Sequence, residues 1–130
     1  MRFMYIVVPA KPTAPTPGLM EAMGKLADRE IKAGRMIDSG GLMPLSTGAL
    51  VSIKDGQLSV VDGPFVEAKE VIGGYAIFEL RDKEEAVAAA VEFMQLHKQH
   101  MPGWEGTCEL RAFATPGRAG ECEAPTLANA

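Results

Sequence analysis

The spacing of apolar residues predicts a strand and then a helix in the first part of the chain. Residues 2–8 are apolar at both alternating sets of positions, which is typical of a central strand covered on both faces. A proline-rich loop follows. Apolar side chains then recur at helical spacing over 17–33, and Thr16 before Pro17 is a suitable N-cap. We therefore predict a helix that stops at Gly34.

The middle of the chain has the pattern of a hairpin. The segment 36–44 contains a short extended piece, and the runs 49–53 and 58–61 are strand-like. Asp55-Gly56 lies between the two runs and is a favoured two-residue turn, because both positions must take positive φ.

The last third of the chain predicts a strand, a helix and a strand. The strands cover 74–80 and 106–113. Asp82 has the position of an N-cap in a capping box completed by Glu85, and the helix runs to about His97. The apolar stripe of this helix consists of Ala86, Val87, Ala90, Val91 and Met94, widened by Phe93.

The element order predicts an α+β fold. The order is strand, helix, hairpin, strand, helix, strand, which is a ferredoxin-like βαββαβ arrangement with an additional hairpin strand. Each helix has one apolar stripe, so we expect both helices on the same sheet face. Either Phe3/Tyr5/Val7 or Met4/Ile6/Val8 must then lie on the opposite face. That face needs a partner, so we predict a homodimer in which two sheets face one another, a dimeric α/β barrel.

Composition and charge narrow the classes of function. A chain of 130 residues with 47% hydrophobic residues suits one globular domain, which we place at 1–114, followed by a flexible tail at 115–130. The net charge of −4 and the lack of a basic stripe argue against nucleic-acid binding. No apolar run reaches the roughly 18–20 residues that cross a bilayer, and no signal peptide is recognisable. We therefore expect a cytoplasmic protein without membrane contact.

The two cysteines do not form a motif. Cys108 and Cys122 are too few for a disulfide framework and no CxxC pair exists, so we expect free thiols. The chain also lacks a Walker loop, a dinucleotide fingerprint and an EF-hand. We accordingly predict no cofactor.

One segment after the hairpin resembles a known family. The run Val-Asp-Gly-Pro-Phe-Val-Glu-Ala-Lys-Glu at 61–70, followed by Ile-Gly-Gly-Tyr at 72–75, is similar to the DGPF motif of YCII-related proteins. The resemblance implies a ferredoxin-like dimeric barrel from a mainly bacterial family, with members encoded beside sigma-factor genes. One distant branch contains a dehalogenase acting on a chlorinated hydroxylated ring. Other members carry a proposed catalytic His-Asp pair, but the segment 16–34 contains no histidine, so that mechanism does not transfer.

The DGPF segment has two interpretations. As a structural loop, it uses its glycine, proline and phenylalanine to set the path of the chain, with exposed charges around them. As a site, it presents Asp62 as a general base in a cleft and Lys69 as a stabiliser of negative charge. The ligand-binding residues would then include Gly63, Pro64, Phe65, Glu67 and Glu70.

Four further residues are candidates outside that segment. His97 is a candidate secondary acid, and it could share a metal ion with His100, but the usual zinc signatures are missing and we predict no metal. Trp104 either plugs the core or dimer contact or forms a stacking wall for a ligand. Tyr75 places a hydroxyl in a sheet-face cavity or packs with one hydrogen bond.

These residues support three hypotheses of function. The first is a homodimer that binds a small organic ligand in a cleft, with a cofactor-free lyase, isomerase or dehalogenase-like activity as one form of it. The second is a non-catalytic ligand-sensing or regulatory module linked to sigma-factor systems. The third is a purely structural role for the DGPF segment.

Overall fold

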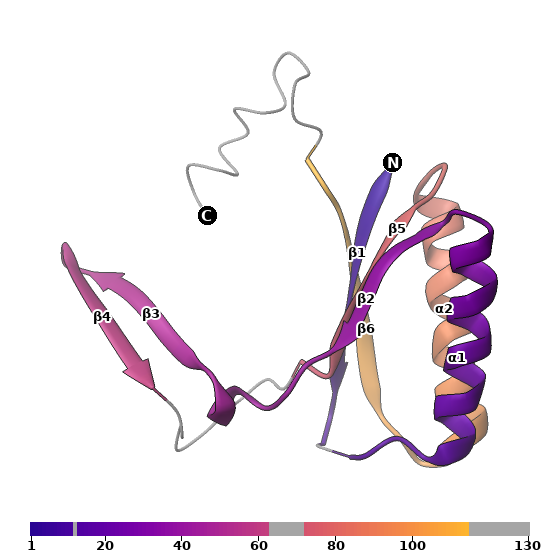
Figure 1. The fold of residues 1–130 in the computed structure, drawn as a ribbon, viewed down its shortest axis with the longest axis horizontal. Helices are drawn as coiled ribbons and strands as arrows, with labels where there is room; N and C mark the ends of the chain where they lie inside the picture. Colours follow the sequence, from indigo (N-terminus) through magenta and orange to yellow (C-terminus); the bar gives the residue numbers. More distant parts are fainter. Residues whose placement is uncertain (12, 63–71, 115–130) are drawn as a thin grey trace.

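The computed structural model describes residues 1–11, 13–62 and 72–114 (Figure 1). The elements follow one another as β1 (Arg2–Pro9), α1 (Pro17–Lys32), β2 (Met36–Gly41), the 3-10 turn η1 (Leu45–Thr47), β3 (Ala49–Lys54), β4 (Gln57–Asp62), β5 (Gly74–Glu79), α2 (Lys83–His100) and β6 (Gly106–Ala112). The predicted tail at 115–130 lies outside the described residues. Within the described ranges, neither helix is long and apolar enough to cross a membrane.

A four-stranded antiparallel sheet carries both helices on one face (Figure 1). Its strand order is β2-β5-β1-β6, consistent with a ferredoxin-like α+β fold. The sequence pattern predicted that one strand of the 49–61 hairpin belongs to this sheet, and that prediction was wrong. The strand β2 occupies the edge beside β5, while β3 and β4 pair only with each other. The short extended piece predicted within 36–44 is β2, but its length and its two glycines gave no sign that it belongs to the main sheet.

Both helices begin at the predicted caps. The Thr16 hydroxyl accepts the Leu19 N–H at 3.1 Å, and an Asp82 carboxylate oxygen accepts the Glu85 N–H at 2.9 Å. The Glu85 side chain in turn accepts the Arg81 N–H at 2.8 Å. These contacts satisfy amide groups that have no partner within a helix.

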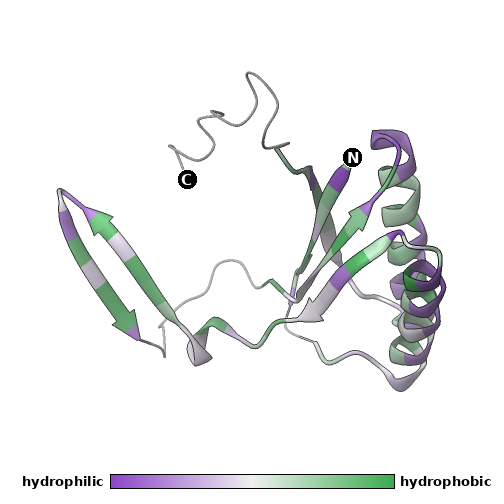
Figure 2. Ribbon diagram, turned by 45° about the horizontal axis from the view of Figure 1, so that its top comes forward, coloured by the Kyte–Doolittle hydropathy of each residue, from purple (hydrophilic) through white to green (hydrophobic). Residues whose placement is uncertain are grey.

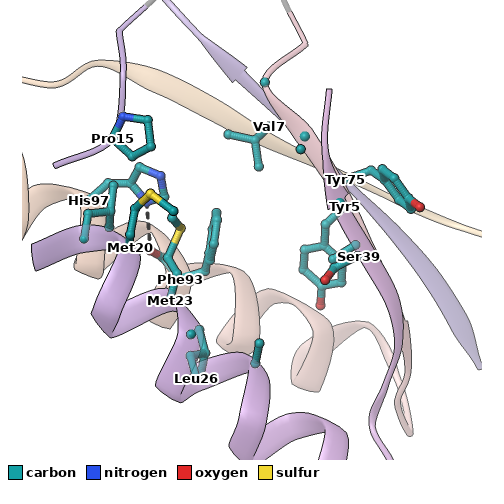
Figure 3. Close-up of a pocket in the computed structure, with 18 of the residues that line it drawn as sticks. Tyr5, Val7, Pro15, Met20, Met23, Leu26, Ser39, Tyr75, Phe93 and His97 are labelled. Carbon is teal, nitrogen blue, oxygen red and sulfur yellow. Dashed lines mark hydrogen bonds between the residues drawn. The ribbon is translucent and has the colours of Figure 1, made fainter. Parts of the chain in front are cut away.

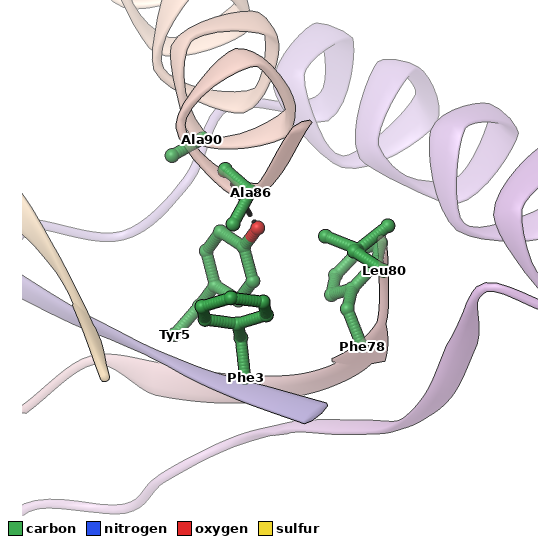
Figure 4. Close-up of a cluster of buried hydrophobic side chains, with 6 residues drawn as sticks. All are labelled: Phe3, Tyr5, Phe78, Leu80, Ala86 and Ala90. Atoms are coloured by element: carbon green, nitrogen blue, oxygen red, sulfur yellow. Dashed lines mark hydrogen bonds between the residues drawn. The ribbon is translucent and has the colours of Figure 1, made fainter. Parts of the chain in front are cut away.

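The core lies between the sheet and α2 (Figure 4). Tyr5 packs against Phe78 with ring centroids 5.0 Å apart, and its hydroxyl donates to the Ala86 carbonyl at 2.7 Å. Burial raises the pKa of Tyr5, so the hydroxyl remains a neutral donor. The cluster of buried side chains consists of Phe3, Tyr5, Phe78, Leu80, Ala86 and Ala90.

The buried face of α2 differs from the predicted stripe. Ala86, Ala90 and His97 are buried, whereas Val87 and Val91 are 41% and 49% exposed. Alanines at several neighbouring positions give this helix apolar residues around most of its circumference, so spacing alone does not select a face.

The β3–β4 hairpin stands away from the sheet, on the side opposite the helices (Figures 1 and 2). Asp55 in its turn has φ of +52°, and the next residue is also positive, as predicted. All residues of both strands are exposed. An isolated two-stranded hairpin is only marginally stable in water, so this element lacks the packing that normally stabilises it.

Two glycines of the α1 region permit a matched test of backbone effects. Gly24 lies inside α1, and Gly34 follows the helix with φ of +77°; a Cβ at either would meet no atom within 4 Å. Gly24→Ala should stabilise the fold by about 0.5–1 kcal/mol, because alanine favours the helix and restricts the unfolded chain. Gly34→Ala should destabilise it by about 1 kcal/mol, because a Cβ disfavours the left-handed region. Denaturant unfolding at one protein concentration measures both, and shifts of the same sign would contradict this account.

Candidate ligand-binding pocket

A pocket of about 510 Å³ lies between the helices and the sheet (Figure 3). Its volume falls within the roughly 300–1,000 Å³ of small-molecule sites. The sheet contributes Tyr5, Val7, Met36, Ala76 and Phe78; α1 contributes Leu19, Met20, Met23, Leu26 and Ala27; and α2 with its following segment contributes Ala89, Phe93, His97, Met101 and Trp104. Thioether and aromatic side chains dominate this lining, a combination that suits a flat apolar molecule.

His97 is held between two aromatic rings at one end of the pocket. Its ring centroid lies 4.7 Å from that of Phe93 and 4.5 Å from that of Trp104, and the residue is 6% exposed. Its Nδ1 lies 3.1 Å from the Phe93 carbonyl oxygen. A carbonyl can only accept, so we assign the proton to Nδ1. In this tautomer the acceptor lone pair is on Nε2.

Trp104 reaches His97 because the chain turns back after α2. Gly103 has φ of +87°, and the Trp104 N–H donates to the Met101 carbonyl at 2.9 Å. The indole lies over Gly106 so closely that a Cβ there would collide with the ring. The glycine that begins β6 therefore helps to place the tryptophan.

A buried carboxylate lies elsewhere on the pocket lining. Glu30 is 4% exposed and accepts hydrogen bonds from Arg35 Nε and Nη2, both at 2.7 Å, and from Arg29 Nε at 2.9 Å. Arg29 also donates to both carboxylate oxygens of Glu92 on α2, at 2.9 and 2.7 Å. The Arg35 hydrogen bond is the main reason that the pKa of Glu30 is lowered, and Arg29 lowers that of Glu92. Both carboxyl groups are thus held in the ionised form.

The structure brings together only part of the predicted site. His97 and Trp104 are in contact and line the pocket. Asp62 ends β4 in the hairpin, is exposed, and does not line this pocket. The predicted residues Gly63, Pro64, Phe65, Glu67, Lys69 and Glu70 lie outside the described residues.

Tyr75 borders the pocket, but its side chain points away from it (Figure 3). It is paired with Ile6 and lies on the open sheet face, where its hydroxyl donates to Asp38 at 3.0 Å. This hydrogen bond raises the pKa of Tyr75. The sheet therefore separates Tyr75 from the pair formed by His97 and Trp104.

Cys108 is a free, half-buried thiol, and burial raises its pKa to about 11. A thiol in that state is a poor nucleophile near neutral pH. Among the residues the structure describes, no three His, Cys, Asp or Glu side chains are grouped as metal ligands.

The antiparallel sheet with two helices on one face defines the chain as a mixed α+β protein with a pocket between its layers. The model of the YCII-related domain matches residues 1–93, so the chain belongs to the YCII-related family. No curated protein matches the sequence. The family match ends at Phe93, and His97 and Trp104 follow it in the chain.

Sequence reasoning missed several pocket residues, above all Glu30. The apolar spacing over 17–33 includes Ile31 and predicts it to be buried, yet Ile31 is 57% exposed and its neighbour Glu30 is buried. The signal was the pair of arginines at 29 and 35, because a carboxylate is rarely buried without such partners.

Proposed function

We propose that this protein binds a small, flat and mainly apolar organic molecule in the pocket between its helices and sheet. The observation that carries the proposal is the acceptor of His97 in a cavity lined mainly by thioether, aromatic and aliphatic groups, where the carboxylates of Glu30 and Glu92 are already paired with arginines. Sites for small ligands combine such a lining with a few placed polar groups that fix orientation.

The ligand has a hydroxyl or N–H group at the His97 end. Because Nδ1 is occupied by the Phe93 carbonyl, the second ring nitrogen accepts a hydrogen bond from the ligand. Trp104 and Phe93 both contact the His97 ring and supply aromatic surfaces. A hydroxylated aromatic ring meets all of these requirements.

Binding fits the described part of the pocket better than acid–base catalysis does. Proton transfer in a cofactor-free reaction commonly uses an acid and a base together. His97 supplies one base, but Glu30 and Glu92, the carboxylates on the lining, already accept hydrogen bonds from arginines. The proposal is therefore a binding or sensing role, and His97 acting as a single base is the catalytic alternative.

The protein acts as a homodimer in this proposal. Phe3 and Tyr5 lie in the core, so Met4, Ile6 and Val8 face the other side of the sheet. These three side chains are only half-buried in the single chain. A second copy of this chain would cover them.

Thymol and thymol methyl ether form a matched pair of probes for the pocket. Both are flat and apolar, but only thymol has a hydroxyl that donates to His97. Trp104, the one tryptophan of the chain, reports binding through its fluorescence. We expect saturable binding of thymol, with the ether about 5–10-fold weaker, the worth of about one hydrogen bond.

Variants at two histidines locate this effect. His97→Phe should abolish the difference between the two probes, and His97→Gln, which keeps an acceptor, should retain part of it. His100→Phe is the control, because His100 belongs to the same helix but does not line the pocket. No saturable change with thymol, or an unchanged preference in His97→Phe, would contradict the proposal.

A further inference from the structure

We infer that the β3–β4 hairpin is a dimerisation arm, and that its apolar face packs on the open sheet face of a second copy of this chain. The inference rests on the homodimer proposed above and adds the element that forms the contact. It begins from the exposure of all residues in both hairpin strands.

The two faces of the hairpin differ in polarity. On one face, Val51 lies opposite Val60 and Ile53 opposite Leu58, and these four side chains are 66–73% exposed. The other face carries the serine pair 52/59 and the pair 54/57 of lysine and glutamine, with Leu50 opposite Val61 nearer the base. Successive residues of a strand point to opposite faces, so these four side chains form one apolar patch, with Ala49 opposite Asp62 at its base. Figure 2 shows the hydrophobic residues along both strands.

The open face of the sheet offers a matching surface. The register places Met4 beside Ile77 and Ile6 beside Tyr75, on the face opposite the helices. On β6, Glu109 and Arg111 share this face and form an ion pair with each other. The result is an apolar band with a polar border, which is the usual anatomy of a protein interface.

The dimensions of the two surfaces agree. Each hairpin strand has six residues and is about 20 Å long, while a four-stranded sheet is about 14 Å from edge strand to edge strand. The six strand residues on the docking face of the hairpin, with the outward side chains of the sheet, come to about 20 per copy, the size of a stable interface.

A second copy is the occupant that fits, because one chain carries both halves of the contact. The hairpin stands on the open side of the sheet, so the hairpin and the open sheet face are on the same side of the molecule (Figure 1). A two-fold axis between the copies then places the hairpin of each copy on the four-stranded sheet of its partner. The contact also supplies the packing that an isolated hairpin lacks.

Two lysine substitutions on adjacent residues of β4 test the arm. Val60 lies on the apolar face and Ser59 on the polar face, and both are exposed in the single chain. In light scattering at micromolar concentration, we expect the full chain to have twice its mass of 13.9 kDa. Val60→Lys should reduce the mass to that of one chain, and Ser59→Lys should leave the dimer intact. Circular dichroism checks that both variants keep their helices.

The outcomes separate the arm from the homodimer itself. A single-chain mass for the unmodified protein would contradict both proposals. A dimer in Val60→Lys would contradict the arm alone, and dissociation by both lysines would contradict docking through the apolar face. If Val60→Lys fails to fold, Val60→Thr has nearly the same shape and should weaken the dimer about tenfold by burying a hydroxyl. An unchanged dissociation constant in Val60→Thr would overturn the inference.

Discussion

Phe3→Ala should lower the free energy of unfolding by about 3–5 kcal/mol. Phe3 on β1 is 2% exposed, and its ring lies in the core between the sheet and α2 (Figure 4). Alanine removes the ring and leaves a cavity. Neighbours such as Phe78 on β5 and Leu80 directly after it refill that cavity only in part, because the sheet holds their backbone in place. Denaturant unfolding at one fixed protein concentration measures the loss.

Phe113→Ala is the matched control for this prediction. Phe113 follows β6 near the same end of the sheet, but it is 41% exposed. The same truncation there should cost about 1 kcal/mol or less, because less apolar surface is returned to water. Equal losses in the two variants would mean that the core is not centred where the structure has it.

Glu30→Gln should lower the free energy of unfolding by about 2–3 kcal/mol at neutral pH. The carboxylate accepts three hydrogen bonds from Arg29 and Arg35. A glutamine has one oxygen and a donating NH₂ group, which faces guanidinium donors without an acceptor. Glu21→Gln on the same helix is the control, because Glu21 and its partner Lys25 are exposed, and it should cost no more than about 0.5 kcal/mol.

The cost of Glu30→Gln should depend on pH in a defined direction. Arg35, followed by Arg29, holds the pKa of Glu30 below its ordinary value of 4.5. A lowered pKa in the folded state contributes stability that is present above pH 4.5 and lost as the pH falls through the lowered value. The difference between the two proteins should therefore shrink in acid. A difference that is constant from neutral to strongly acidic pH would contradict the ion network.

Local signals in the sequence were sufficient for the caps and for the hairpin turn. Thr16, Asp82 and Asp55 act through contacts or dihedral preferences within a few residues, so the sequence contains the whole interaction. The family resemblance was confirmed by the match over residues 1–93.

Long-range packing could not be predicted in the same way. Glu30 depends on Arg35 across a turn and, through Arg29, on Glu92 of the other helix. Hairpin pairing also gave no indication that both strands stay outside the main sheet, because that depends on which segment occupies the edge beside β5.

The candidate site was predicted only in part, because some of its residues are brought together by long-range packing. His97 and Trp104 are close in sequence, and each is a rare residue type of this chain near the helix-breaking pair Pro102-Gly103. The residues of α1 that line the same pocket are far from them in the sequence, and no local pattern connects the two segments. The two alternatives for Tyr75 could not be separated, because the face on which its side chain lies is set by the register of β5 with β1.

The most direct test of the pocket is a methyl NMR titration of the full chain with thymol, using methionines labelled at their methyl groups. Met20, Met23, Met36 and Met101 line the pocket, Met4 lies on the opposite face of the sheet, and Met43 is 74% exposed. We expect saturable shifts of the four pocket signals, with one dissociation constant, while those of Met4 and Met43 stay in place. Shifts confined to Met4, or equal small shifts at all six methionines, would contradict ligand binding between the helices and the sheet.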